Sequence, residues 1–118
     1  MYQVKYYKKE NGSEPVKDFL DQLPLKMQSK AMATIEILEE FGVQLREPYS
    51  KPIGNGLFEL RIKFASDISR IFFFFYSGNN IILTNGFIKK AGKLSSREKK
   101  KAMSYKQDYE RRYGHDKF

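Results

Sequence analysis

The sequence contains no cysteine and a single histidine, His115. Without cysteine the chain forms no disulfide and has no thiol nucleophile, and zinc is not expected with one histidine. His115 is the fourth residue from the end, where chains commonly fray, so we do not expect a histidine-based catalytic triad or acid–base pair. The sequence has no clustered Asp, Glu and His of the kind that binds metals, and we expect no metal or other cofactor.

Long hydrophobic runs are also absent. No window approaches the roughly 18 apolar residues of a membrane span, and the opening residues MYQVKYYKK lack the apolar part of a signal peptide. We therefore expect a cytoplasmic protein without membrane contact. A chain of 118 residues buries roughly two-thirds of its unfolded surface, and we expect a single domain over residues 1–118.

Positive charge is concentrated in the last quarter of the chain. Residues 1–88 contain 11 Lys or Arg and 10 Asp or Glu, whereas residues 89–118 contain 11 and 4. Nearly all of the net charge of +8 therefore lies after residue 88. A basic segment on a small domain indicates a polyanionic partner, with nucleic acid first. The alternative is a solvated helix face that serves only solubility.

The hydrophobic pattern predicts an α+β fold with the order β-α-α-β-β-β-α. A small antiparallel sheet would carry an N-terminal helical hairpin and a C-terminal helix. Ser13 is the expected N-cap of the first helix, and Ser95 with Glu98 forms a capping box before the last. The expected elements are a strand over 2–8, helices over 13–23 and 25–41, a loop over 43–56, strands over 57–64, 68–76 and 81–88, and a helix over 95–112.

The strands between residues 57 and 88 bring cations to one place. Arg61 lies on the polar face of its strand, and Arg70 shares a face of the next strand with Phe72. If the two strands pair as a hairpin, both guanidinium groups reach one surface. Lys89 and Lys90 close the third strand. The planar fork of arginine matches a phosphate, and lysine adds a mobile point charge.

This set of cations suits ribonucleolytic cleavage. The 2′-hydroxyl of RNA attacks the adjacent phosphate, and positioned cations stabilise the charge that develops on the phosphoryl oxygens. The substrate supplies the nucleophile, so the protein supplies positioning and proton transfer. Glu59 is a candidate base, and a lysine among the other cations is another. The candidate catalytic residues are Arg61, Arg70, Lys89, Lys90 and Glu59.

Further residues are candidates for RNA binding. Phe72 or Tyr76 would stack on an unpaired base. Each residue also has an ordinary structural interpretation: Arg61 as a solvated partner of Glu59, Arg70 as a partner of Asp67 or a helix acid, and the phenylalanine run as core. The candidate RNA-binding residues are Lys63, Phe72, Lys93, Arg97, Lys100 and Lys101.

Three segments and the final helix resemble the RelE/ParE toxin superfamily, specifically its HigB-like, phage-derived branch. The segments are GLFELR at 56–61, SRIFF at 69–73 and GFIKK at 86–90, and the helix carries Glu98 and Ala102. The element order also fits, so the resemblance spans nearly the whole chain. It places Arg61, Arg70, Lys89 and Lys90 at positions where the family has basic catalytic or phosphate-binding groups.

The resemblance implies a bacterial toxin that cleaves mRNA, usually on the ribosome. It also implies neutralisation by a HigA-like helix-turn-helix antitoxin, through which the pair binds operator DNA. Family members often continue the lysine pair with Thr-x-Lys-Thr-Pro, where this chain has Ala91–Ser95. Some relatives use a C-terminal histidine or tyrosine, for which Tyr109, Tyr113 and His115 are candidates here.

Two other functions remain open from the residues. A ParE-like toxin would poison DNA gyrase through protein contacts and would need no nuclease site. A plain RNA- or DNA-binding module would bind with strong salt dependence and leave the nucleic acid intact.

Overall fold

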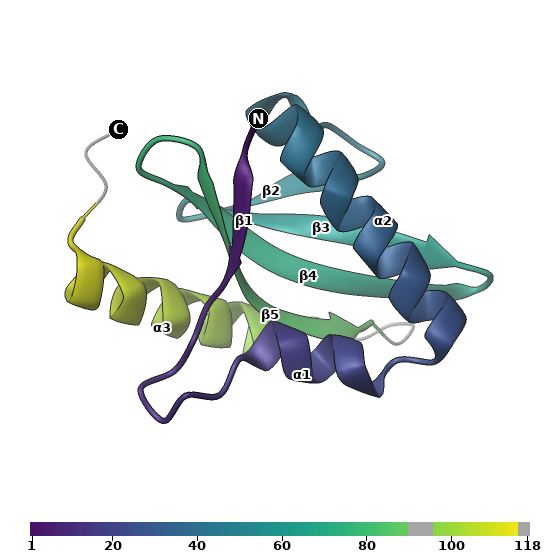
Figure 1. The fold of residues 1–118 in the computed structure, drawn as a ribbon, viewed down its shortest axis with the longest axis horizontal. Coiled ribbons are helices and arrows are strands. Elements are labelled where there is room, and N and C mark those ends of the chain that lie inside the picture. The colour runs from purple at the N-terminus through teal and green to yellow at the C-terminus, as the bar shows by residue number, and fades with distance from the viewer. Residues whose placement is uncertain (90–95, 116–118) are drawn as a thin grey trace.

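The computed structural model describes residues 1–89 and 96–115. Its sheet has five strands in the order β1-β5-β4-β3-β2, in which β1 runs parallel to β5 and the other neighbours pair antiparallel (Figure 1). The predicted α+β class is therefore confirmed. The elements are β1 (Gln3–Tyr6), α1 (Pro15–Gln22), α2 (Leu25–Phe41), the 3-10 turn η1 (Gly42–Gln44), β2 (Ser50–Gly54), β3 (Leu57–Phe64), β4 (Asp67–Tyr76), β5 (Asn80–Ile88) and α3 (Ser96–Tyr113).

Helices cover both faces of this sheet. α1 and α2 pack on one face, and α3 packs on the other (Figure 1). β4 lies in the middle of the sheet, so its alternate side chains enter two separate cores. Phe73 is fully buried under α1 and α2, and Phe72 and Phe74 are 1% exposed on the α3 side. Most of the phenylalanine run is thus core, as its apolar pattern indicates.

The predicted helix over 25–41 is confirmed to the residue. Its buried side chains include Met27, Ala31, Ile35 and Leu38, which recur at helical spacing. Gly42 ends the helix with a positive φ of 51°, and its N–H donates to the Leu38 carbonyl. Of the helices in the part of the chain that the structure describes, none is long and apolar enough to cross a membrane.

The prediction of a plain loop over 43–56 is wrong. Residues 50–54 form the edge strand β2, in which Ser50 pairs with Leu60 and Pro52 with Phe58. Proline and glycine hide the strand period here, yet an edge strand tolerates a proline because one side needs no N–H donor. β2 adds a strand to the predicted order.

The predicted cap of the first helix is also wrong. Glu14 occupies the N-cap position and makes no side-chain cap bond, while Pro15 begins the helix as expected. The N–H of Ser13 instead donates to Asn11 Oδ1 at 3.0 Å, inside the preceding turn. Ser13 therefore belongs to the turn before α1 and does not cap the helix.

A bulge in β5 decides which of its side chains face α3. Phe72 pairs with Asn85, but the next residue, Phe73, pairs with Leu83, so Thr84 is the extra residue. The bulge turns Asn85 towards α3 although Leu83 faces the other core. Gly86, next to the bulge, lies close to α1, because a Cβ there would be 2.5 Å from a ring carbon of Phe19.

Candidate functional site

Arg61 and Arg70 lie directly opposite each other on β3 and β4. Both arginines lie on the face of the sheet that α3 covers farther along the strands. Side chains alternate between the two faces of β4, so Arg70 lies on the same face as Phe72, which packs on the α3 side. Opposed residues on paired strands have Cβ atoms roughly 4.5–5.5 Å apart. The expectation that hairpin pairing brings both arginines to one surface is confirmed.

A buried ion pair holds one of these arginines. Arg70 Nη1 donates to Glu59 Oε2 at 2.5 Å, and the residues are 7% and 6% exposed. The partner of Arg70 is therefore Glu59, and not Asp67. Arg61 is the freer arginine: its side chain is 32% exposed and its Nε lies 4.0 Å from the same Glu59 oxygen.

The carboxylate of Glu59 lies between two like charges. Its charge offsets the repulsion that Arg61 and Arg70 would otherwise impose on each other. Within residues 1–89 and 96–115, the buried Nε atoms of both arginines have no hydrogen-bond partner. The site therefore combines a fixed guanidinium with a more exposed one, which is an arrangement suited to an anion.

Lysines extend the cationic surface towards one end of the sheet. Lys63 pairs with Ile68 across β3 and β4, and the N–H of Lys89 donates to the Ile68 carbonyl at 3.2 Å. Both lysines are exposed, and they flank the arginine pair from β3 and from the residue that follows β5. Lys90 and Lys93, together with the rest of the segment 90–95, lie outside the described residues.

The start of α3 is fastened beside this surface. Asn85 Nδ2 lies 3.1 Å from both the carbonyl and Oε1 of Glu98. Arg97, Lys100 and Lys101 are exposed on the first turns of the helix, and Lys101 makes a 3.4 Å contact with Glu98. These cations therefore lie on the same side of the sheet as the arginine pair. The part of the chain that the structure describes holds no group of three His, Cys, Asp or Glu side chains able to bind a metal ion.

Phe72 does not have the position that base stacking requires. Its side chain is 1% exposed and packs edge-on against Phe87 at 5.2 Å between ring centres. With both ring faces inside the core, Phe72 offers no surface to an unpaired base. The assignment of Phe72 to RNA binding is corrected to a core role.

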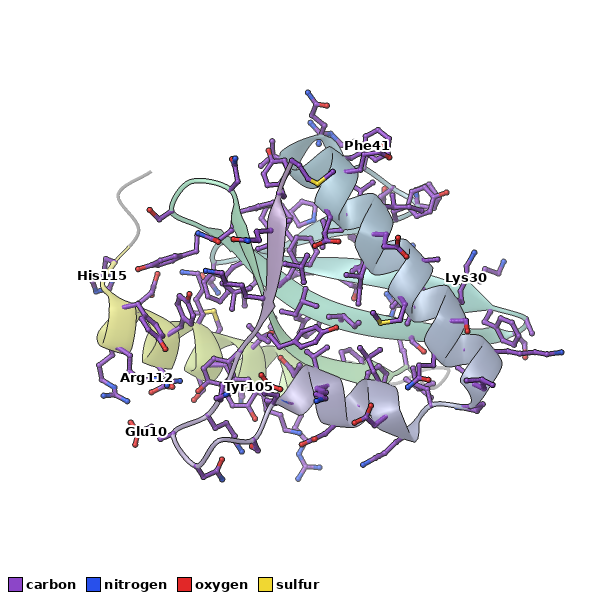
Figure 2. All side chains as sticks on the ribbon, viewed as in Figure 1. Glu10, Lys30, Phe41, Tyr105, Arg112 and His115 are labelled. Carbon is purple, nitrogen blue, oxygen red and sulfur yellow. The ribbon has the colours of Figure 1, made fainter. Side chains whose placement is uncertain are left out.

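The C-terminal candidates lie at the far end of α3. The helix has 18 residues, so its ends are roughly 27 Å apart at 1.5 Å per residue. Tyr76 Oη contacts the carbonyls of Tyr113 and Gly114 at 2.8 Å, and His115 is an 85% exposed side chain near Glu110 (Figure 2). Tyr113, His115 and also Tyr76 are therefore not brought to the arginine pair.

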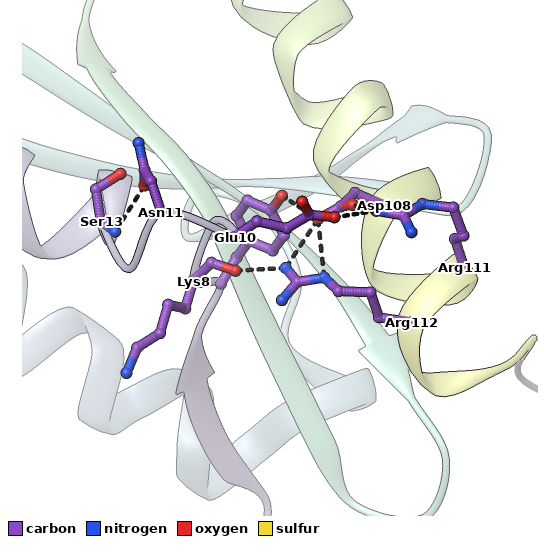
Figure 3. A network of polar contacts seen from close by, with 8 residues as sticks. Lys8, Glu10, Asn11, Ser13, Asp108, Arg111 and Arg112 are labelled. Carbon is purple, nitrogen blue, oxygen red and sulfur yellow. Dashed lines mark hydrogen bonds and ion pairs between the residues drawn. The ribbon is translucent and has the colours of Figure 1, made fainter.

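A polar network absent from the sequence predictions ties this end of α3 to the segment after β1 (Figure 3). Tyr7 Oη donates to Asp108 Oδ2 at 2.5 Å, and Arg112 donates to the same oxygen at 2.8 Å through Nη2. Arg112 also donates to the Lys8 carbonyl. Tyr7 and Asp108, like Lys8 and Arg112, are about 100 positions apart in the sequence, so no local motif predicts these contacts.

The network shifts the ionisation of its members. Burial, followed by the Asp108 hydrogen bond, raises the pKa of Tyr7 to about 12. The same hydrogen bond lowers the pKa of Asp108. Arg111 completes the network by bridging Asp108 and Glu10, the latter at 2.7 Å. Tyr7 is therefore a protonated donor at neutral pH, and the network has a structural role.

We expect Tyr7→Phe to remove a pH-dependent part of the stability. An unfolded tyrosine titrates near pH 10, so the folded state holds its proton more tightly between pH 10 and about 12. The stabilisation of wild type over Tyr7→Phe should be complete below pH 10 and decline as the pH rises towards 12. Urea denaturation at a series of pH values measures the difference. A difference that stays constant from pH 9 to 12 would contradict this role of Tyr7.

Residues 18–107 match the family model described as phage derived protein Gp49-like (DUF891). The matched span covers about three-quarters of the chain and includes Glu59, Arg61, Arg70 and the first turns of α3. A comparison with curated proteins gave no significant match.

Proposed function

Since the chain belongs to the phage-derived Gp49-like family, the HigB-like branch of the RelE/ParE toxins, we propose that it is an endoribonuclease toxin that cleaves mRNA. The observation that carries this function is the opposed pair Arg61 and Arg70, held by Glu59 on a face that continues into exposed lysines. A phosphodiester is the ligand that a pair of guanidinium groups fits best.

In this mechanism the 2′-hydroxyl of one nucleotide attacks the adjacent phosphorus, and the bond to the 5′-oxygen of the next nucleotide breaks. Arg61, the more exposed arginine, would contact a phosphoryl oxygen as negative charge develops there. Arg70 would add its charge from a fixed position. Lys89 and Lys90 would bind the phosphate, or one of them would transfer a proton.

Glu59 could act as the general base or could position Arg70. Its Oε2 is already bonded to Arg70, which favours positioning of the guanidinium over removal of the 2′-hydroxyl proton. We therefore assign Glu59 to positioning, with the base among the lysines. Lys63, Arg97, Lys100 and Lys101 would contact the backbone of mRNA or of ribosomal RNA, because they are exposed cations on the same side of the sheet as the arginine pair.

Toxins of this family have antitoxin partners. For this chain we propose neutralisation by a HigA-like helix-turn-helix protein, with operator DNA bound through that partner. A cationic surface left unoccupied by RNA suits an acidic or amphipathic segment. Co-expression with the product of the neighbouring reading frame, followed by co-purification, tests this partnership.

Induced expression in a bacterial cytoplasm, followed by mapping of mRNA 5′ ends, tests the nuclease. We expect new ends within coding regions, and the same experiment with purified mRNA, with and without ribosomes, shows whether ribosomes are needed. Intact mRNA together with inhibition of gyrase supercoiling would instead support a ParE-like toxin. Intact mRNA with salt-dependent binding alone would support a binding module.

A further inference from the structure

A pocket lies next to Arg61, where β3 extends beyond the end of β2, and outside the arginine pair itself. It has a volume of about 310 Å³, at the lower end of the range typical of small-ligand sites. α2 contributes Lys30 and Thr34, the segment before β2 contributes Tyr49, and β3 contributes Arg61 and Lys63. We propose that this pocket binds one unpaired nucleotide of the RNA strand, next to the cleaved phosphate.

The charge of the pocket favours an anionic ligand. Lys30, Arg61 and Lys63 all line it, and the described residues that line it include no carboxylate. Lys30 and Lys63 are exposed, and Figure 2 shows Lys30 on α2. Three cations around one hollow repel one another, and a phosphate group between them would relieve that repulsion.

Tyr49 gives the pocket a surface for a base. The residue is 41% exposed, which leaves ring surface open. Its backbone is fixed to the site, because the Tyr49 carbonyl accepts a 2.8 Å hydrogen bond from the N–H of Arg61. Stacking on an aromatic ring is the common way in which proteins hold an unpaired base.

Arg61 connects the pocket with the arginine pair. Arg61 lines the pocket, lies opposite Arg70 on the paired strand, and has a side chain that is 32% exposed. A strand whose scissile phosphate contacts Arg61 beside Arg70 would therefore place a neighbouring nucleotide in the pocket. Its base would stack on Tyr49, and its own phosphate would contact Lys30 and Lys63. This assignment rests on the proposed RNA substrate and adds the position at which the strand is held.

Binding of an uncleavable strand isolates the pocket from the chemistry. We suggest a fluorescently labelled single-stranded RNA hexamer with 2′-O-methyl riboses, which lacks the nucleophile, measured by anisotropy with the full chain. Tyr49→Leu should weaken binding about tenfold, the size expected for loss of one base–aromatic stack. Tyr49→Phe should bind within about twofold of wild type, because the ring is kept.

The lysines are tested by salt dependence. Replacing both Lys30 and Lys63 by alanine should lower the slope of log affinity against log salt by about 0.7, the value for loss of one phosphate contact on a single strand. Lys5→Ala is the matched control, because Lys5 is exposed on β1 at the opposite edge of the sheet. Circular dichroism of each variant verifies the fold.

Failure of the pocket and failure of the nuclease give different results. If wild type cleaves mRNA but Tyr49→Leu binds the hexamer as tightly as wild type, the pocket assignment is wrong. If the hexamer binds in a Tyr49-dependent way and mRNA stays intact, the pocket stands and nuclease activity is wrong. Unchanged RNA binding with loss of a co-expressed antitoxin would show that the pocket is a protein-docking site, which would overturn its assignment to RNA.

Discussion

Arg61→Ala should lower mRNA cleavage by about 10²–10³-fold, the size of effect seen when one donor to a developing oxyanion is removed. The loss should appear in the catalytic rate, because Arg61 is assigned to charge that develops in the transition state. End mapping after a timed incubation, with wild type in parallel, measures the rate. Growth of cells after induction of this variant should recover to an extent that matches the loss of cleavage.

The Arg61 variant is informative because it should remain folded. The Arg61 side chain is 32% exposed, and its contact with Glu59 is 4.0 Å long, so the free energy of unfolding should change by no more than about 1 kcal/mol. Arg111→Ala is the matched control, an exposed arginine at the far end of α3. If Arg61→Ala, combined with Arg70→Ala, still cleaves mRNA and arrests growth, the catalytic assignment is wrong.

Glu59→Ala should reduce the free energy of unfolding by about 3–5 kcal/mol. This substitution leaves Arg70 buried without the carboxylate to which Nη1 donates, and breaking one side of a buried ion pair costs about that much. Urea denaturation of the purified protein measures the loss. The double variant Glu59→Leu with Arg70→Met should regain most of the stability, because apolar side chains then replace both charges.

Variants of Glu59 and Arg70 also separate effects on folding from effects on catalysis. The double variant should be stable and inactive, whereas a role of Arg70 in stability alone would leave it active. Glu59→Gln tests the assignment of Glu59 to positioning. It should leave the shape of the pH–rate profile unchanged, and loss of one limb of that profile would show that Glu59 is the general base.

The positions of the candidate cations were accessible from the sequence for a physical reason. The alternation over 57–64 has a period of two and continues for a full strand, so it places Glu59 and Arg61 on one face. The helical spacing of apolar residues in α2 likewise lies within one segment of the chain. Turn residues then join β3 to β4 and β4 to β5, and short connections between strands favour antiparallel neighbours. The shared surface of Arg61 and Arg70 follows from these local signals.

The roles within the site depended on contacts between distant segments. The sequence does not show that Arg70 is buried on Glu59, because a polar residue in a strand is usually solvated. Phe72 had two interpretations, and only packing beneath α3 decided for the core. The bulge at Thr84, which turns Asn85 towards Glu98, leaves no mark in the hydrophobic pattern.

The sequence by itself determined the α+β class, the limits of α2 and β3, and the strands that bear the arginines, because each depends on a period within one segment. The tertiary structure decided the rest: the strand β2, the Glu59–Arg70 pair, the Tyr7–Asp108 bond across the chain, and the pocket beside Tyr49. These depend on which segments meet, and a buried charge or an exposed ring acquires its role only from the neighbours that folding provides.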